Sequence, residues 1–387
     1  MKIGFLMSQW PSRDVDSGVA QAYHRVAVAL AARNHHVTVF HLYPGRAFWE
    51  RSRRYREQGF DVVEIPCRLL PPSLMRGWVP FHLAALLRLF LKRNELEQLD
   101  VIETIFYGGF ARLYQKLIWR GRPPILVRVS TTGEQTSEIN QQTGTGYSAG
   151  LEKQLIRTAP YLCTHTAAHR NLLCANLGID PARIEMIPHG IAMPDLSTLP
   201  PVKEKKVLYV GRYEPRKGTD VLLQAIPLVL SREPDVRFVL VGSGLMAHAW
   251  KTEFLAKHAA CADRVEFLEQ LSDAELETLY QGCDFFVAPA RYESFGLTYI
   301  EAMRYGKPVI GCLASGGSVE VIGDGGLLVP AGEAQPLAEA IVRLWTDRDL
   351  HRELSLRARR QAERYSIERQ VEISEEVYAR MIRGGSS

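Results

Sequence analysis

The stretch PARYESFGLTYIE, residues 289–301, places two carboxylates, Glu293 and Glu301, on either side of a glycine-containing turn. Asp284–Ala288, directly before it, is apolar after its first residue and predicts a buried strand. Leu297–Arg304, at its end, predicts a helix. A strand, a tight turn and a helix start form a natural site for phosphate, because unpaired backbone N–H groups point outward there.

The spacing of the two carboxylates limits the chemistry that they can perform. If the helix starts near Ser294, Glu293 lies in the loop and Glu301 lies about two turns inside the helix. A rise of ~1.5 Å per residue then separates the carboxylates by about 10–12 Å. This is too far for a shared proton or for the pair of a retaining glycosidase, whose carboxyls lie ~5 Å apart. The spacing suits a ligand with hydroxyls at both ends and negative charge between them, such as a sugar nucleotide; two surface carboxylates flanking a turn are the alternative.

The composition is typical of a globular protein with more than one domain. The chain has 387 residues, of which 46% are hydrophobic and 23% charged, a length that suits two domains of ordinary size. The six cysteines are scattered without a CxxC pair, which predicts reduced thiols and a cytoplasmic location. No apolar stretch approaches the ~20 residues that a membrane span requires. Residues 1–200 carry 23 Lys and Arg against 16 Asp and Glu, so this half favours an anionic partner, such as a lipid surface or a phosphorylated acceptor.

Short apolar segments alternate with helical ones in both halves of the chain. In the first half a helix is expected over Val19–Arg33. This alternation predicts an α/β protein with two doubly wound, Rossmann-like parallel sheets that bind ligands at the carboxyl ends of their strands, in the cleft between them. The strands expected are Lys2–Met7, Val37–Leu42, Asp100–Glu103, Ile125–Val129, Lys206–Val210, Arg237–Val241, Arg264–Leu268, Phe285–Ala288, Pro308–Cys312 and Leu327–Val329.

The expected domain boundaries follow from the proline content and from the restart of the pattern. Pro188–Pro201 has four prolines in fourteen residues and predicts a linker. We therefore expect an N-terminal domain over residues 1–190 and a linker over 191–205. A second domain is expected over 206–364, followed by a final segment over 365–387.

Three blocks together resemble the retaining glycosyltransferases of family 4, which have the GT-B fold. Val210–Gly218 (VGRYEPRKG) is similar to the family's Gly-Arg…Lys-Gly loop. Phe238–Gly244 (FVLVGSG) is similar to the strand and GxG turn that follow, and Pro289–Pro308 to the paired-glutamate block and the strand after it. A single GxG or Arg-x4-Lys is weak evidence, but three blocks in order are specific. The resemblance covers nearly the whole chain and is densest from Lys206 to Gly332.

The resemblance implies that residues 1–190 form the acceptor-side domain and that residues 206–364 bind the nucleotide sugar. It also implies the roles of the site residues. Arg212 and Lys217 would grip the diphosphate of the donor, and Glu301 would accept hydrogen bonds from its ribose. Glu293 would contact the transferred sugar, next to Ser294. Backbone N–H groups of Phe295, Gly296 and Leu297 would contact the phosphates or the sugar. Glu293, Arg212 and Lys217 are the expected catalytic residues. The resemblance also implies that residues 365–387 cross back to the N-terminal domain as a helix whose Ile367, Val371, Ser374 and Tyr378 share one face.

The N-terminal half departs from the family pattern at several positions. Asp16-Ser17-Gly18-Val19 is similar to the family's glycine-rich loop but has Ser-Gly where Gly-Gly is usual; Gly18 still lets the backbone approach the donor phosphate. Many members carry a histidine after the strand equivalent to Ile125–Val129, where this chain has Ser130 or a neighbour. Gly242 in the GxG turn could contact the donor, or it could serve only to form the turn; both interpretations stay open.

Two further patterns are weighed against a site. Asp14-Val15-Asp16 matches a metal motif of the other main glycosyltransferase fold, but here it precedes a glycine loop in a two-domain chain. His189, where the family has asparagine, is expected to be a linker residue rather than a polar contact. No metal and no cofactor are expected.

The segment Arg46–Arg56 contains five arginines and three aromatic residues. If it is helical, Phe48, Arg51 and Tyr55 share one side, and this face could rest on anionic lipid. A solvated surface helix whose aromatic residues pack on the domain is the alternative. Nothing else in the chain resembles a nucleic-acid-binding module, so no nucleic-acid partner is expected.

The sequence thus predicts a cytoplasmic, metal-independent retaining glycosyltransferase, with peripheral contact to the inner face of a membrane left open. The donor would be a nucleoside-diphosphate sugar, with UDP favoured because it predominates in the family, and the acceptor a hydroxyl on a lipid or glycan. The alternatives are a phosphorylase or sugar-phosphate synthase on the same fold, a sugar-nucleotide epimerase, and a non-catalytic binding subunit.

Overall fold

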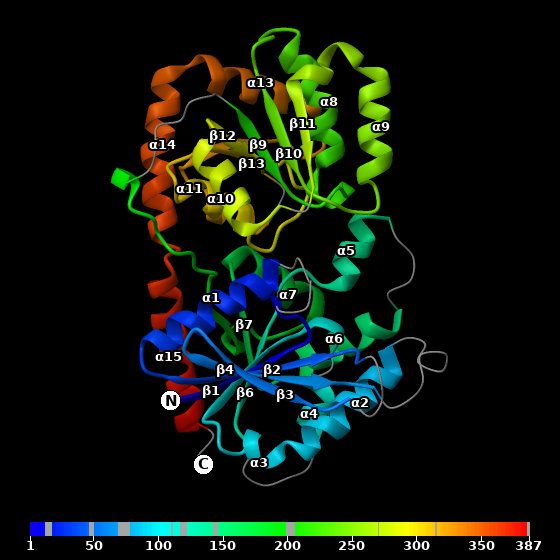
Figure 1. The fold of residues 1–387 in the computed structure, drawn as a ribbon, viewed down its shortest axis with the longest axis vertical. Helices are drawn as coiled ribbons and strands as arrows, with labels where there is room; N and C mark the ends of the chain where they lie inside the picture. The colour runs from blue at the N-terminus through cyan, green and yellow to red at the C-terminus, as the bar shows by residue number, and fades with distance from the viewer. Residues whose placement is uncertain are drawn as a thin grey trace.

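The computed structural model describes residues 1–11, 18–45, 50–68, 78–109, 111–116, 122–141, 146–198, 206–269, 271–313 and 316–384. Two sheets stand one above the other, each covered by helices on both faces (Figure 1). Among the described strands, every pairing is parallel except the one between β3 and β4. The predicted fold class, two doubly wound parallel sheets, is therefore confirmed.

The N-terminal sheet has eight strands in the order β3-β4-β2-β1-β5-β6-β7-β8. The central strands are almost entirely buried, as is typical of a parallel sheet covered on both faces. The strands are β1 Lys2–Met7, β2 His36–Tyr43, β3 Arg53–Glu57, β4 Phe60–Pro66, β5 Val101–Ile105, β6 Ile125–Arg128, β7 Tyr161–Thr164 and β8 Ile184–Met186. The helices that cover them are α1 Gly18–Ala32, α2 Trp78–Leu91, α3 Arg93–Leu96, α4 Ala111–Lys116, α5 Gly133–Ile139, α6 Gly146–Thr158 and α7 Ala167–Leu177.

The C-terminal sheet has six strands in the order β11-β10-β9-β12-β13-β14. Its strands are β9 Val207–Val210, β10 Phe238–Val241, β11 Val265–Leu268, β12 Phe285–Val287, β13 Val309–Cys312 and β14 Gly326–Val329. Its helices are α8 Thr219–Leu230, α9 Ala247–Lys257, α10 Asp273–Gly282, α11 Leu297–Met303, α12 Gly317–Ile322, α13 Ala334–Thr346 and α14 Arg348–Glu363. Short 3-10 turns, among them η3 Tyr107–Gly109 and η6 Pro215–Lys217, lie between strands and helices.

The last helix, α15 Ile367–Gly384, packs on the N-terminal sheet although the chain reaches it from the C-terminal one (Figure 1). Ile367, Val371, Ser374 and Tyr378, which the resemblance places on one face, are all buried. The Tyr378 hydroxyl donates to the Glu103 carboxylate at 2.5 Å. The chain therefore crosses between the two sheets twice, once near Ile191 and once near Ser366, and these two crossings form a β-bridge.

The sequence located the ten strands that it predicted to within two residues, but it missed β3, β4, β7 and β8. The expectation of a helix over Arg46–Arg56 is wrong for its second half, because Arg53–Glu57 form the edge strand β3; Arg46–Trp49 lie outside the described residues. Five consecutive residues of β3 pair antiparallel with β4, which leaves no helical face there. Within the described ranges, no helix is both long and apolar enough to cross a bilayer.

Candidate functional site

The paired-glutamate block follows β12 and leads into α11, as the sequence predicts. The helix begins at Leu297, as predicted from Leu297–Arg304, and not near Ser294 as assumed for the spacing of the carboxylates; Gly296, with φ 96°, caps it in a left-handed conformation. Glu301 is therefore the fifth residue of the helix and lies just past its first turn, not two turns inside it. The hydroxyl of Tyr299 donates to the Ala288 carbonyl at 2.6 Å and fixes α11 against the end of β12.

Glu293 lies in the loop before α11 and is buried against two cations of a neighbouring loop. One carboxylate oxygen forms a short ion pair with the Lys217 ammonium, and the other lies 3.5 Å from the Arg216 guanidinium. Burial alone would raise the pKa of this carboxyl, but Lys217 and Arg216 outweigh burial and hold the pKa below its ordinary value. With its side chain 11% exposed, Glu293 is not a solvated surface carboxylate. Burial also lowers the pKa of Lys217, against the opposing effect of Glu293.

The loop that carries these cations follows β9 and packs directly against the glutamate block. Gly218, with φ 71°, approaches so closely that a Cβ there would lie 1.9 Å from the Pro289 carbonyl oxygen. Only glycine fits this approach. Arg291 anchors the same loop through hydrogen bonds to the Pro215 carbonyl and the Asp220 carboxylate. The two blocks that the sequence singled out separately therefore form one site.

The two arginines of this loop, Arg212 and Arg216, have different surroundings. Arg212 is largely exposed, with its side chain 61% accessible and Glu214 3.2 Å away. Arg216 is buried and donates to Glu214 at 2.7 Å and to the Tyr292 carbonyl at 3.1 Å. The sequence did not single out Arg216, which lies 3.5 Å from the buried Glu293 carboxylate.

Glu301 contacts both domains. It accepts a hydrogen bond from the Tyr280 hydroxyl at 2.9 Å, and its other oxygen lies 3.7 Å from the Arg25 guanidinium on α1. Among the described residues, Nε and Nη2 of Arg25 have no hydrogen-bond partner although both atoms are buried. The sequence drew attention to neither Arg25 nor Tyr280, because contacts between distant segments leave no local pattern.

Several N-terminal residues contact the same loops from the other side. Asn140, after α5, donates to the Glu214 carboxylate at 3.0 Å and accepts from the Arg216 backbone N–H at 2.9 Å. Thr166 donates to the Ser294 carbonyl at 2.9 Å. Gly18, at the start of α1, lies near Leu297, since a Cβ at Gly18 would be 3.9 Å from the Leu297 side chain. The starts of α1 and α11 therefore face each other across the two domains.

Behind these contacts lies an aromatic cluster that joins the domains. The rings of His165 and His189 stack with centroids 3.8 Å apart, and both meet the ring of Phe295 edge-on. Burial holds the pKa values of both histidines well below their ordinary range, so the pair is neutral at pH 7. His189 is thus a buried packing residue at the crossing between the domains, in keeping with the linker role expected for it.

The tentative site residues Ser130 and Gly242 and the possible metal motif at Asp14 and Asp16 remain to be placed. Ser130 follows β6 at the carboxyl edge of the N-terminal sheet and is half-buried. Gly242 follows β10, and a Cβ there would lie 1.9 Å from the Gly211 carbonyl oxygen, so close packing alone requires glycine. Asp14 and Asp16 lie outside the described residues. In the part of the chain that the structure describes, no three His, Cys, Asp or Glu side chains gather as metal ligands would.

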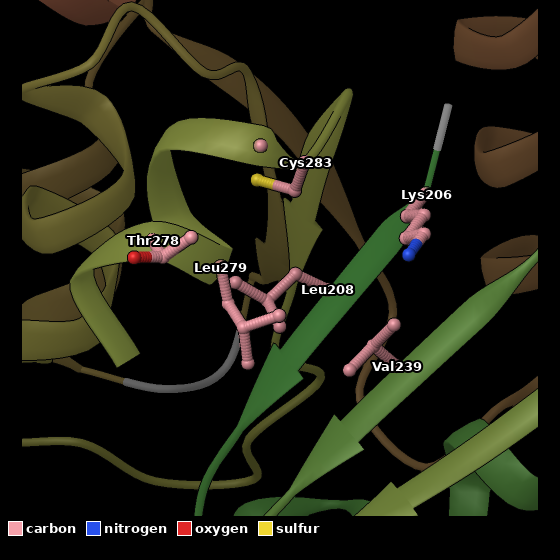
Figure 2. A pocket seen from close by; sticks show the side chains of 7 residues that line it. Lys206, Leu208, Val239, Thr278, Leu279 and Cys283 are labelled. Carbon is pink, nitrogen blue, oxygen red and sulfur yellow. The ribbon is translucent and has the colours of Figure 1, made fainter. Parts of the chain in front are cut away.

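A cavity of about 370 Å³ lies at the opposite edge of the C-terminal sheet and is separate from this site. Figure 2 shows Leu208 and Leu279 pointing toward one another, with Cys283 at the end of α10 and Lys206 before β9. These residues lie at the amino ends of the strands. The cavity therefore cannot contribute to chemistry at the carboxyl ends, where Glu293 and Lys217 lie.

Comparison with known proteins gives two family matches that together span most of the chain. Residues 197–361 match the glycosyl transferases group 1, and residues 17–193 match glycosyltransferase family 4. A D-inositol 3-phosphate glycosyltransferase of Nocardia farcinica is 34% identical over 54% of this chain and 49% of its own length. A phosphatidyl-myo-inositol mannosyltransferase of Mycobacterium leprae is 37% identical over 41% of this chain and 43% of its own. The chain thus spans about half the length of the curated relatives that it matches.

Solved structures share the fold at low sequence identity. A sucrose-phosphate synthase from Thermosynechococcus elongatus superposes with a TM-score of 0.80 and 22% identity, over 99% of this chain and all of that one. Anabaena HepE, solved in complex with UDP and glucose, gives a TM-score of 0.73 and 19% identity, over 98% of this chain and 99% of its own. The arrangement of the two sheets is that of the GT-B fold.

Proposed function

The chain belongs to the group 1 glycosyltransferases of family 4, and from this premise we propose that it is a retaining hexosyltransferase. It takes a hexose from a nucleoside-diphosphate sugar and transfers it to an acceptor hydroxyl. The observation that carries this proposal is the buried Lys217–Glu293 pair beside Arg216, at the carboxyl edge of the C-terminal sheet. A buried ion pair is weak evidence for stability, and a polar cluster at this edge is typical of a binding site.

In the proposed complex the donor lies along α11, between the two glutamates. The Glu301 carboxylate accepts from the ribose hydroxyls, supported by the Tyr280 hydroxyl that already donates to it. Arg212, whose side chain is largely exposed, reaches the diphosphate together with Lys217. The backbone N–H groups of Phe295, Gly296 and Leu297 add uncharged donors at the start of α11. The Glu293 carboxylate accepts hydrogen bonds from the hydroxyls of the transferred sugar.

The protein would promote the transfer mainly by electrostatic stabilisation of the leaving group. As the bond between sugar and diphosphate breaks, negative charge grows on the leaving phosphate, and cations placed in advance stabilise it without reorganisation. Lys217 is held by Glu293 in one position, which limits the entropy that it would otherwise lose. Because these cations supply positive charge, we propose that transfer needs no metal ion. Retention of the anomeric configuration is proposed from family membership.

The acceptor is proposed to be a polyol that carries a phosphate, either free or as a lipid headgroup. Relatives named for D-inositol 3-phosphate and for phosphatidyl-myo-inositol share this chemistry. The excess of basic residues in the first 200 residues of the chain would favour such an anion. UDP is the favoured nucleotide, since HepE, which has the same fold, is solved with UDP and with UDP-glucose.

A transfer assay tests this function directly. The protein is incubated with UDP-, GDP- and ADP-hexoses, each with D-inositol 3-phosphate or phosphatidylinositol, with and without EDTA. Products are detected by mass spectrometry, and the anomeric configuration is read by NMR. We expect one donor class to give a product with retained configuration and an unchanged rate in EDTA. Nucleotide binding without product under any combination would favour a non-catalytic binding subunit, and loss of activity in EDTA would contradict the metal-independent chemistry.

A further inference from the structure

Asn140 ends α5 in the N-terminal domain, and its side-chain amide binds a loop of the C-terminal domain. The amide Nδ2 donates to the Glu214 carboxylate at 3.0 Å, and Oδ1 accepts from the Arg216 backbone N–H at 2.9 Å. A backbone N–H can only donate and an ionised carboxylate can only accept, so the two partners fix which way the amide points. Both ends of one amide are therefore used on the loop that carries the donor-site cations.

The helix that carries Asn140 is anchored in its own domain. A capping box closes the first turn of α5. The Gly133 N–H donates to the Glu152 carboxylate at 3.2 Å, and the Lys153 ammonium pairs with Glu134 at 2.7 Å, so α6 holds α5 through two side chains. Figure 1 shows α5 on the side of the N-terminal domain that faces the C-terminal one. A side chain on such an anchored helix can place its partner accurately.

Glu214 is the acceptor that Asn140 and both arginines of the loop share. One carboxylate oxygen lies 2.7 Å from the Arg216 guanidinium and 3.2 Å from the Arg212 guanidinium, while the other takes the Asn140 amide. The Arg216 side chain is 5% exposed and the Arg212 side chain 61%. A single carboxylate thus contacts a buried guanidinium, which needs a partner, and an exposed one, which is proposed to bind the diphosphate.

Loss of the Asn140 amide would change how Glu214 is divided between the two arginines. One carboxylate oxygen would lose its hydrogen bond, and a carboxylate pairs most favourably with a guanidinium through both oxygens at once. Arg212 is the exposed partner and can turn to form such a pair, whereas Arg216 is also held by the Tyr292 carbonyl at 3.1 Å. A bidentate pair between Glu214 and Arg212 would compete with a diphosphate for the same guanidinium.

We propose that Asn140 is a positioning residue for donor binding, which holds Glu214 against Arg216 and so leaves Arg212 to bind the diphosphate. Asn140 acts through Glu214 and does not itself need to touch the donor. The N-terminal domain thereby raises donor affinity through one amide on the opposite loop. This inference rests on the proposed function, since it requires that Arg212 meets a diphosphate.

Titration calorimetry of the full chain tests this role. UDP, GDP and ADP are offered to the wild type, and the diphosphate that it binds is compared with the matching nucleoside. Asn140→Asp keeps an acceptor for the Arg216 N–H but sets a carboxylate against Glu214. We expect at least about a tenfold loss of affinity for the diphosphate, because like charges in contact repel and drive Glu214 toward Arg212. Binding of the nucleoside, which lacks the diphosphate, should be unchanged.

A second substitution provides the rescue. In Asn140→Asp/Glu214→Gln the amide and the carboxylate exchange sides, so the hydrogen bond between the two positions can form again and the net charge equals that of Asn140→Asp less one negative charge, as in the wild type. Arg216 keeps Glu293 3.5 Å away. We expect the double variant to recover most of the lost diphosphate affinity, which a merely loosened fold would not do.

The matched control is Asn176→Asp, which adds the same charge at an exposed position of α7 in the same domain and should bind like the wild type. Thermal midpoints show that each variant is folded. Equal diphosphate binding by Asn140→Asp and the wild type, equal losses for diphosphate and nucleoside, or no recovery in the double variant would each overturn the inference and leave the proposed function in place. A wild type that binds none of the three nucleotides would contradict the proposed function, and this inference with it.

Discussion

Arg25 on α1 and Glu301 on α11 lie 3.7 Å apart, although they belong to different domains and are 276 residues apart in the chain. Glu301 is the carboxylate proposed to bind ribose, so the N-terminal domain already contacts the donor site through this guanidinium. Two of the Arg25 nitrogens are buried and lack hydrogen-bond partners among the described residues. Buried guanidinium nitrogens without partners are costly, and an anionic donor phosphate nearby would lower this cost.

Arg25→Gln is therefore expected to weaken donor binding. The variant removes a positive charge beside Glu301 but keeps a polar, though shorter, side chain. Because Arg25 is partly exposed, we expect a loss of about threefold to tenfold in UDP affinity, at the low end for a charge-assisted contact. Titration calorimetry with UDP measures it. The matched control is Arg33→Gln, directly after the same helix, where the guanidinium pairs with Glu375 away from the site. A similar loss in both variants would show that Arg25 acts only through general charge.

Lys217→Ala should weaken donor binding by about one to two orders of magnitude, since a charge-assisted contact contributes roughly 1.5–3 kcal/mol. The change also removes the largest of the cationic effects that lower the Glu293 pKa, so this pKa should rise, although Arg216 and Arg212 still act on the carboxylate. Calorimetry with UDP and with uridine separates the two effects, because only UDP carries the diphosphate. Lys257→Ala, at an exposed i,i+4 pair on α9, is the control. Equal losses for UDP and uridine would rule out the diphosphate role.

The anchoring of α15 predicts a stability effect far from the site. Glu103 is buried on the central strand β5 of the N-terminal sheet and accepts from Tyr23, Arg128 and Tyr378. Tyr378→Phe removes one of these donors and leaves the carboxylate less satisfied, which we expect to cost about 1–3 kcal/mol. A fall in thermal midpoint measures this cost, with the exposed Glu376→Gln on the same helix as control. An unchanged midpoint in Tyr378→Phe would show that water replaces the hydroxyl.

His169, at the start of α7, predicts how stability depends on pH. Its Nδ1 lies 2.6 Å from the Thr164 hydroxyl, and burial lowers the pKa of His169 to about 4. Because the unfolded chain binds this proton with a pKa of about 6.5, stability is intact above that pH and falls as the pH drops from about 6.5 to 4. The loss reaches about 3 kcal/mol near pH 4.

His169→Gln removes this titration and should flatten the fall, as measured by urea unfolding at several pH values. The exposed His248→Gln is the control and should follow the wild type. A wild-type and a His169→Gln profile with the same slope between pH 6.5 and 4 would show that His169 titrates normally.

The sequence predicted the fold because both sheets are built from short apolar runs that local patterns reveal. Strands such as Val309–Cys312 are buried on both faces and read as continuous apolar segments. Strand β3 was missed for a physical reason: it is an exposed edge strand whose arginines give it no apolar pattern. Its sequence, RRYRE, is equally compatible with a surface helix, and only pairing with β4 decides its conformation.

The site was predicted in part. Glu293, Arg212 and Lys217 stand in motifs whose spacing is visible along the chain, and the structure brings Glu293 and Lys217 into contact. Arg25 and Asn140 were not found, because they reach the site from the other domain. Their positions depend on how the two sheets face each other, which leaves no signature in the sequence near either residue.

The central claim is that the Lys217–Glu293 pair forms the base of a donor site, and proton NMR of donors tests it most directly. UDP-, GDP- and ADP-sugars are added to the wild type and to Glu293→Gln, without acceptor. The account predicts that the wild type selectively broadens the proton signals of donors with one kind of nucleotide. Glu293→Gln should broaden the sugar signals of the same donors much less, while both proteins broaden the base signals. Broadening of no donor by the wild type, or identical sugar broadening by both proteins, would contradict it.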